Sequence, residues 1–133
     1  MVKKIKVLTA IGNENLNNIL RTKSEFDILE KDIFYKEGIL EFLEKNNNVD
    51  ILILYEKLAG EINIINLLNK IKKINNTINI IFVLENKNND LEILLKKENI
   101  KNIFYINEIN INDFIEKIKN IKINNNQKLI EEI

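Results

Sequence analysis

The chain has 133 residues, in which 20 lysine and arginine residues balance 20 aspartate and glutamate residues. It contains no cysteine and no histidine, which excludes disulfides and thiolate metal sites and removes the commonest general base. The formal net charge is zero, so the chain lacks the excess of positive charge that is typical of nucleic-acid-binding domains. The apolar runs are far shorter than the ~20 residues of a membrane span, so no membrane contact is expected. We expect one domain in the cytoplasm, without a signal peptide.

Short apolar runs alternate along the chain with segments whose apolar residues repeat at helical spacing. Strands are predicted at residues 4–10, 25–33, 50–55, 77–85 and 102–107. Helices are predicted at residues 13–21, 36–46, 61–74, 90–99 and 112–121. Such alternation implies parallel strand pairing through right-handed crossovers. The predicted fold class is therefore α/β, a three-layer α/β/α sandwich whose five-stranded parallel sheet has the order 2-1-3-4-5.

The same periodicity predicts which side chains face the core. The edge-like strand at 25–33 is expected to turn Phe26, Ile28 and Ile33 inward, the first helix Leu16, Ile19 and Leu20, and the last helix Phe114, Ile115 and Ile118. Isoleucine, lysine, asparagine and glutamate dominate the composition, and all four have A/T-rich codons. We therefore attribute the many asparagines to genomic base composition and assign them no function.

The last residues differ in character from the rest. Residues 1–121 are predicted as one domain and residues 122–133 as a C-terminal extension or linker. Asn124–Asn126 interrupt the helical pattern, and Leu129, Ile130 and Ile133 then form a small apolar set. Two interpretations stay open: a frayed extension of the last helix, or a linker or short pairing helix that leads into another domain.

A search for catalytic or ligand-binding motifs finds little. No glycine-rich nucleotide motif is present. Gly12 lies in the first strand–helix turn, where a phosphate could meet a helix N-terminus, but a glycine that merely eases the turn is the favoured interpretation. The carboxylates expected near the carboxyl ends of strands are Glu14, Glu56, Glu61 and Glu85. Solvated loop charge is favoured over metal binding for them, and no metal and no cofactor is expected.

The segment DILILYEKLAG, residues 50–60, is the most informative stretch. Response-regulator receiver domains commonly carry the pattern P-D-x-x-x-x-D-x-x-x-P-G. Here Asp50, four apolar residues, Tyr55 and the pair Ala59-Gly60 fall at the same spacing. With the five alternating units, residues 3–121 thus resemble a receiver domain, which has a flavodoxin-like fold. The resemblance implies that Tyr55 stands at the position of the phospho-accepting aspartate.

The other receiver positions also depart from the family pattern. The family's acidic pair after strand one corresponds to the stretch Thr9, Ala10, Ile11 and Gly12. Its hydroxyl residue after strand four corresponds to Leu84, and its lysine after strand five corresponds to Ile106-Asn107. Those groups bind the cation and the phosphoryl oxygens in an active receiver. The resemblance therefore implies a degenerate pseudo-receiver. We expect Tyr55 to be largely buried and to fill the vacated site together with Leu84.

The preferred function is a non-phosphorylatable regulatory module in signal transduction, not an enzyme, that acts through a protein partner or a homodimer. It is expected to form part of a larger protein with an output domain, and receiver-like domains of this kind also precede MinD-like ATPases. The interface implied by the resemblance comprises helix four, strand five and helix five, with Glu92, Lys96, Lys97, Tyr105, Asp113 and Lys117. The competing interpretation is that these charges only solvate two amphipathic helices.

Two other functions remain open. A small-molecule sensor would use a crevice at the carboxyl ends of strands one and three, lined by Gly12, Asn13, Tyr55 and Glu85. A pocket in which these polar groups converge would favour the sensor, whereas a crevice filled by Tyr55 and Leu84 would favour the interaction module. An enzyme with an unfamiliar site is the least favoured alternative.

Overall fold

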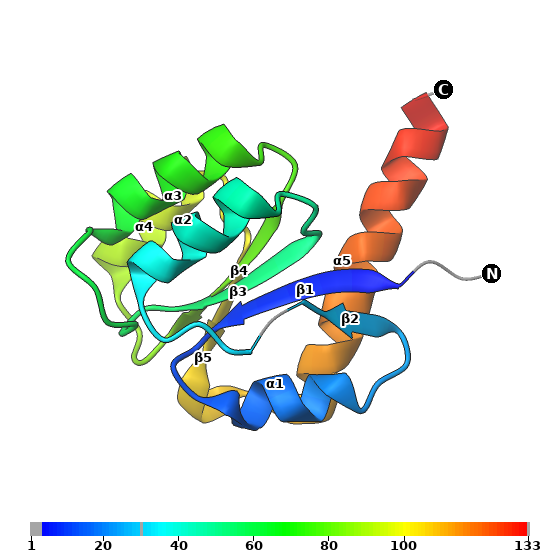
Figure 1. The fold of residues 1–133 in the computed structure, drawn as a ribbon, viewed down its shortest axis with the longest axis horizontal. Helices are drawn as coiled ribbons and strands as arrows, with labels where there is room; N and C mark the ends of the chain where they lie inside the picture. The colour runs from blue at the N-terminus through cyan, green and yellow to red at the C-terminus, as the bar shows by residue number, and fades with distance from the viewer. Residues whose placement is uncertain (1–3, 30, 133) are drawn as a thin grey trace.

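A parallel sheet with β3 at its centre organises the molecule (Figure 1). The computed structural model describes residues 4–29 and 31–132, with side chains described as far as Ile121. The strands are β1 (Ile5–Ala10), β2 (Phe26–Ile28), β3 (Ile51–Tyr55), β4 (Asn79–Leu84) and β5 (Asn102–Tyr105). Their order is β2-β1-β3-β4-β5, and each neighbouring pair is parallel. The predicted sheet is confirmed.

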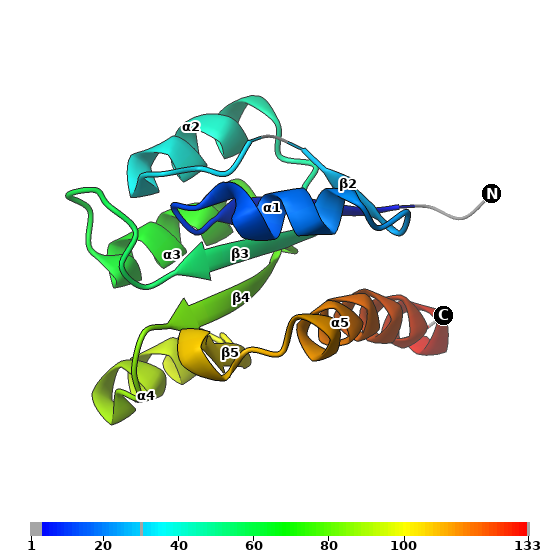
Figure 2. The same ribbon diagram turned by 90° about the horizontal axis from the view of Figure 1, so that it is seen from below.

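Helices cover both faces of this sheet (Figures 1 and 2). The helices are α1 (Glu14–Arg21), α2 (Lys36–Lys45), α3 (Ile64–Ile74), α4 (Asn89–Lys97) and α5 (Ile111–Glu132), and a 3₁₀ turn, η1 (Ile106–Glu108), connects β5 to α5. Helices α1 and α5 pack on one face, and α2, α3 and α4 pack on the other. The predicted three-layer sandwich is therefore confirmed.

Two apolar cores form, one on each face, because β3 is buried on both sides. Ile51 and Ile53 pack with Leu20 of α1 and with Phe114, Ile115 and Ile118 of α5, in what we call the α1–α5 core. Leu52 and Leu54 pack with Ile39 and Leu43 of α2, Leu67, Leu68 and Ile71 of α3, and Leu95 of α4, in the α2–α4 core. All four β3 side chains are 0% exposed, which explains the unbroken apolar run in the sequence.

Asparagine side chains begin several helices. Asn13, Asn63 and Asn88 accept hydrogen bonds from the backbone N–H groups of Asn15, Asn66 and Leu91, at 2.8, 2.8 and 3.1 Å. A side-chain oxygen at this position satisfies an N–H group that has no partner within the helix, and each such cap contributes about 1 kcal/mol. These three asparagines therefore have a structural role as helix caps, whatever the origin of the composition.

The second strand and the first helix differ from their predictions. β2 spans only Phe26–Ile28, and Ile33 packs outside it, in the α2–α4 core. On α1, Ile19 is 40% exposed whereas Asn17 is 2% exposed. Asn17 takes the inward place because its amide donates to Thr9 Oγ1 at 3.0 Å and its oxygen accepts from Arg21 Nε at 2.7 Å. A polar side chain satisfied in this way can be buried without penalty.

The last helix is longer than predicted. The backbone of α5 continues through Asn124–Asn126 as far as Glu132, so the three asparagines do not interrupt the helix. Figure 1 shows this extension projecting beyond the sheet. Residue 133 and the side chains of residues 122–133, with the apolar set of Leu129, Ile130 and Ile133, lie outside what is described. Within the described residues, no helix is long and apolar enough to cross a bilayer.

Candidate functional site

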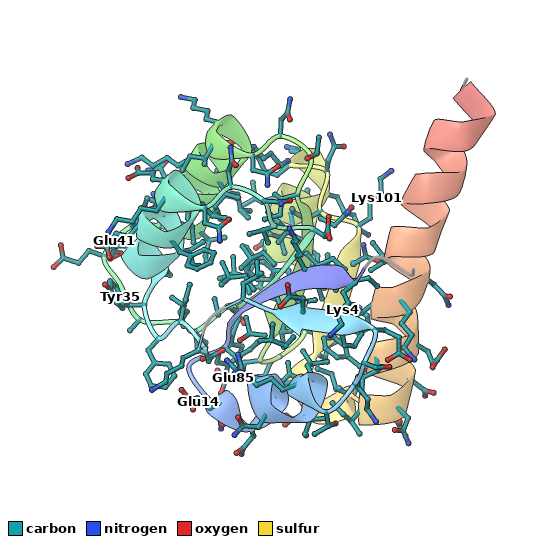
Figure 3. The ribbon with its side chains drawn as sticks, turned by 45° about the vertical axis from the view of Figure 1, so that its right-hand side comes forward. Lys4, Glu14, Tyr35, Glu41, Glu85 and Lys101 are labelled. Atoms are coloured by element: carbon teal, nitrogen blue, oxygen red, sulfur yellow. The ribbon has the colours of Figure 1, made fainter. Side chains whose placement is uncertain are left out.

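The candidate site lies where β1, β3 and β4 end. Parallel strands bring their carboxyl ends to one edge of a sheet, and loops at that edge usually carry function. Ala10 pairs with Leu54, and Tyr55 pairs with Val83, so the ends of the three strands lie side by side. In Figure 3, Glu14 and Glu85 lie at this edge, whereas Lys4 and Lys101, which precede β1 and β5, lie toward the opposite end.

Tyr55 closes β3 and packs against the α1–α5 core. Its exposure is intermediate, so the expectation of a largely buried ring was too strong. Burial is the main reason that the pKa of the Tyr55 phenol is raised, and the charges of Glu85 and Glu56 add to the rise. The hydroxyl is therefore neutral at ordinary pH and offers no anionic oxygen to a cation.

We expected Leu84 and Tyr55 to fill one space together, but their side chains lie on opposite faces of the sheet. Leu84 is 0% exposed and packs in the α2–α4 core, on the face opposite to the Tyr55 ring. Successive side chains of a strand point to opposite faces. Because Val83 is paired with Tyr55 and shares its core, Leu84, the next residue, must face the other side.

The remaining positions at the predicted site are structural or exposed. Thr9 is 0% exposed, and its Oγ1 accepts the hydrogen bond from Asn17. Ala10 is 0% exposed and packs in the α2–α4 core. Ile106 lies in η1 and is 39% exposed, so it does not close the site. Tyr55 and these three residues therefore do not form a common pocket.

A carboxylate that the sequence analysis missed occupies the loop between β1 and α1. Asp32 Oδ1 accepts from the N–H of Ile11 at 3.0 Å, and its Oδ2 accepts from Gly12 at 2.7 Å and Asn13 at 2.9 Å. Asp32 is only 7% exposed. The stretch from Thr9 to Gly12 indeed has no acidic residue of its own, but the acid comes from the next loop at the same edge. Asp32 was missed because it fell inside the stretch 25–33 that was predicted as a strand, whereas β2 ends at Ile28 and leaves Asp32 in a loop.

Glu56 and Glu85 link the loops that follow β3 and β4. Glu56 Oε1 accepts from the N–H of Glu85 at 3.0 Å, and the N–H of Glu56 donates to the Val83 carbonyl at 2.9 Å. Lys57 Nζ lies 4.0 Å from Glu85 Oε2. Glu61 belongs elsewhere, since its N–H donates to Glu37 Oε1 of α2 at 3.0 Å. Among the described residues, no group of three or more acidic side chains could hold a metal ion.

One cavity at this edge shares only one residue with the crevice expected for a small-molecule sensor. A cavity of about 520 Å³ lies between the β3–α3 and β4–α4 loops. It is lined by Glu56, Lys57, Glu85, Asn86, Lys87, Asn88, Asn89 and Asp90. Of the four residues expected to line a sensor crevice, only Glu85 takes part; Gly12, Asn13 and Tyr55 do not.

Comparisons with known proteins agree on one architecture. By sequence, the chain matches no protein-family model and no curated protein. By structure, it is similar to a CheY-like response regulator receiver domain protein from Methanospirillum hungatei JF-1, with TM-score 0.79 and 17% identity over 95% of this chain and 98% of that chain. The chain has the receiver-domain fold.

Two further solved structures support the same fold. A DNA-binding response regulator of the LuxR family from Staphylococcus aureus gives a TM-score of 0.75 at 17% identity, covering 88% of this chain and 98% of that chain. A response regulator from Thermotoga maritima gives a TM-score of 0.68 at 15% identity, covering 90% and 98%. The architecture is thus shared at nearly full length, whereas the sequences have diverged widely.

The six residues of the predicted interface lie on α4, β5 and α5. Hydrogen bonding with the Glu92 carboxylate of α4, followed by burial, raises the pKa of Tyr105 on β5 to about 12. Lys117 Nζ lies 5.2 Å from the centre of the Phe104 ring, which meets the Phe114 ring edge-to-face at 4.9 Å. The remaining three, Lys96, Lys97 and Asp113, are exposed.

We predict that Tyr55→Ala lowers the free energy of unfolding by about 2 kcal/mol, because a half-buried ring loses part of its packing. Tyr55→Phe keeps the ring and should stay within about 0.5 kcal/mol of the wild type. Urea denaturation of both variants measures the difference. A loss below about 0.5 kcal/mol for Tyr55→Ala would contradict the packing role.

The Tyr105 pKa predicts an alkaline loss of stability. Folding favours the neutral phenol, whose pKa is about 12 in the folded protein against about 10 in an unfolded chain. This contribution is complete below about pH 10 and is lost as the pH rises through about 12. Across this pH range, we expect the urea midpoint of Tyr105→Phe to decrease less than that of the wild type or of Tyr35→Phe. Equal slopes in wild type and Tyr105→Phe would contradict the assignment.

Proposed function

We propose that this chain is a receiver-like regulatory module that acts through protein contacts and without phosphoryl transfer. The observation that carries the proposal is the place of Tyr55, which ends β3 at the edge where β1 and β4 also end. By resemblance this is the position of a phospho-accepting aspartate. A neutral phenol with a raised pKa cannot replace that carboxylate as acceptor or cation ligand.

The positions that the resemblance matches to the family's assisting groups also carry other residues. Leu84 is buried where the family has a hydroxyl, and Ile106-Asn107 stand in place of the lysine. The carboxylate nearest the end of β1, Asp32, has both oxygens engaged by backbone N–H groups. Phosphoryl transfer depends on positioned charges, so the absence of these groups supports a module that does not catalyse it.

The proposed contact surface comprises α4, β5 and the first turns of α5. Ile93 and Leu94 of α4 are 54% and 43% exposed, and Ile106 beyond β5 is 39% exposed. Lys96 and Lys97 follow Ile93 and Leu94 on α4. Exposed apolar residues rimmed by charge are typical of a protein-binding surface. A second copy of the chain is the simplest occupant, since one surface then serves both sides.

We place this module in the cytoplasm, as one part of a larger signalling protein. A structural neighbour from Staphylococcus aureus is described as a DNA-binding response regulator, which illustrates one kind of output. An ATPase of the MinD-like class is the other output that we propose. The domain itself is expected to bind neither nucleic acid nor membrane, since its formal net charge is zero.

Acetyl phosphate with Mg²⁺ tests the proposed loss of phosphoryl transfer. We expect no mass increase in the wild type, and none in Tyr55→Asp, because the assisting hydroxyl and lysine would still be missing. Mass spectrometry of the intact protein and its peptides gives the readout. One added phosphoryl group on residues 55–60 of the wild type would contradict the proposal.

Self-association tests the proposed contact surface. We expect the wild type to form a reversible dimer at or below about 100 μM, a standard binding free energy of about −5.5 kcal/mol or stronger. Ile93→Ser combined with Leu94→Ser should shift sedimentation toward the monomer. Ile19→Ser is the matched control, because Ile19 is 40% exposed on α1 outside the proposed surface. A monomeric wild type, or an equal loss in the control, would contradict the dimer.

A further inference from the structure

A cavity of about 830 Å³ lies at the amino end of the sheet, opposite to the candidate functional site. It forms where the loops that precede β4 and β5 meet α5, and we call it the amino-end cavity. Ile80 and Ile100 are buried at its floor, with 5% and 3% of their surface exposed. Ile78 and Ile121 also line it and are half-buried. Part of its apolar lining is therefore still accessible to a partner.

The charge of the amino-end cavity is positive. Lys72 of α3 and Lys101, which precedes β5, both line it, and none of the described residues that line it is acidic. The remaining polar side chains of its lining are asparagines, which carry no charge. An occupant that combines apolar side chains with carboxylates would match both the lining and its charge.

Helix α5 lines the amino-end cavity through Ile121 and then continues past it to Glu132. The extension over residues 122–132 is about 16 Å long at the helical rise per residue. Figure 1 shows it projecting beyond the sheet, and in Figure 3 Lys101 lies toward the same end of the molecule. A helix that continues in this direction carries its last residues away from the cavity of its own chain.

The sequence at the end of this extension complements the amino-end cavity. Residues 129–133 are Leu-Ile-Glu-Glu-Ile, three apolar residues and two carboxylates. Leu129 follows Ile118 by eleven positions, which is about three turns of a helix. This spacing continues the apolar stripe with which α5 packs on the sheet. Because the extension projects beyond the sheet, a continued stripe needs a partner from outside the chain.

We propose that the amino-end cavity binds residues 129–133 of a second copy of this chain. The two α5 helices then lie antiparallel about a twofold axis, and each supplies its last residues to the cavity of the other. The same surface serves both copies, so the contact closes as a dimer. It is separate from the proposed contact surface on α4 and β5, and it stands whether or not that surface pairs.

Two kinds of contact hold the exchanged segment in this dimer. The apolar side chain of Leu129 covers the half-buried Ile121 of the other copy, while the Glu131-Glu132 pair faces Lys72 and Lys101. With Leu129 of one copy beside Ile121 of the other, the twofold axis passes near residue 125 of both helices. Exposed charge pairs are screened by salt, so we expect the dimer to weaken as the ionic strength rises.

Exchanging the charges of the cavity and the segment tests the proposal. We expect Lys72→Glu combined with Lys101→Glu to raise the dimer dissociation constant about tenfold or more, because like charges then face each other. Glu131→Lys combined with Glu132→Lys should do the same. All four substitutions in one chain restore opposite charges and should return the dissociation constant to within about threefold of the starting value. Sedimentation equilibrium gives the readout.

The background of these variants separates the two proposed contacts. All of them carry Ile93→Ser and Leu94→Ser, which remove the apolar contact proposed for α4, so that the remaining pairing reports on α5. Lys70→Glu combined with Lys73→Glu is the matched control, since both are exposed lysines of α3 outside the lining of the cavity. The control changes the net charge equally and should leave the dissociation constant unchanged.

A single cysteine locates the contact, because the chain has none of its own. Asn125→Cys places one thiol of each copy near the twofold axis. Gln127→Cys places it two positions later, about 200° around the helix. On mild oxidation we expect a disulfide-linked dimer from Asn125→Cys and much less from Gln127→Cys, since a disulfide forms only between thiols that face each other closely. Adding Lys72→Glu and Lys101→Glu should lower the yield.

The proposal is overturned if the chain with Ile93→Ser and Leu94→Ser is a monomer at about 100 μM. It is also overturned if the fourfold charge exchange does not recover pairing, if the Lys70 and Lys73 control weakens pairing equally, or if the two cysteine variants cross-link equally. A wild type that dimerises while the Ile93 and Leu94 variant is monomeric would support the α4 contact alone, so the two proposals fail separately.

Discussion

Burial of β3 on both faces is the constraint on which the rest of the structure depends. Ile51 and Ile53 face one apolar core, Leu52 and Leu54 face the other, and none of the four is exposed. A shift of one residue would exchange the two faces of the strand. The same alternation decides that Tyr55 emerges on the side of α1 and α5, and that the paired strand β4 turns Val83 toward it and Leu84 away.

At the carboxyl edge of the sheet, side-chain carboxylates accept hydrogen bonds from backbone amides of neighbouring loops. Asp32 binds the amides of the β1–α1 loop, and Glu56 binds the Glu85 amide in the loop after β4. Tyr55 packs against the α1–α5 core with a neutral hydroxyl. The carboxylate hydrogen bonds join the loop after β2 to the loop after β1, and the loop after β3 to the loop after β4.

The sequence was sufficient for the architecture because periodicity directly reflects which faces are buried. The helices, the buried strands and the place of Tyr55 at the end of β3 follow from it, whereas the strand order followed from the topology that alternating strands and helices favour. The Asp32 contacts could not be predicted, since they join residues 19 to 21 positions apart through a side chain. Ile19 was misplaced because a hydrogen-bonded Asn17 occupies the inward position. Helix-capping asparagines were hidden by a composition already rich in that residue.

The proposed role rests on the loss of phosphoryl transfer at the edge where β1, β3 and β4 end. The most direct measurement is an amide NMR titration of the full chain with beryllium fluoride and Mg²⁺, which together mimic a bound phosphoryl group. We expect unchanged signals for the loops after β1, β3 and β4. Saturable shifts centred on Tyr55 and spreading to α4 and β5 would contradict it.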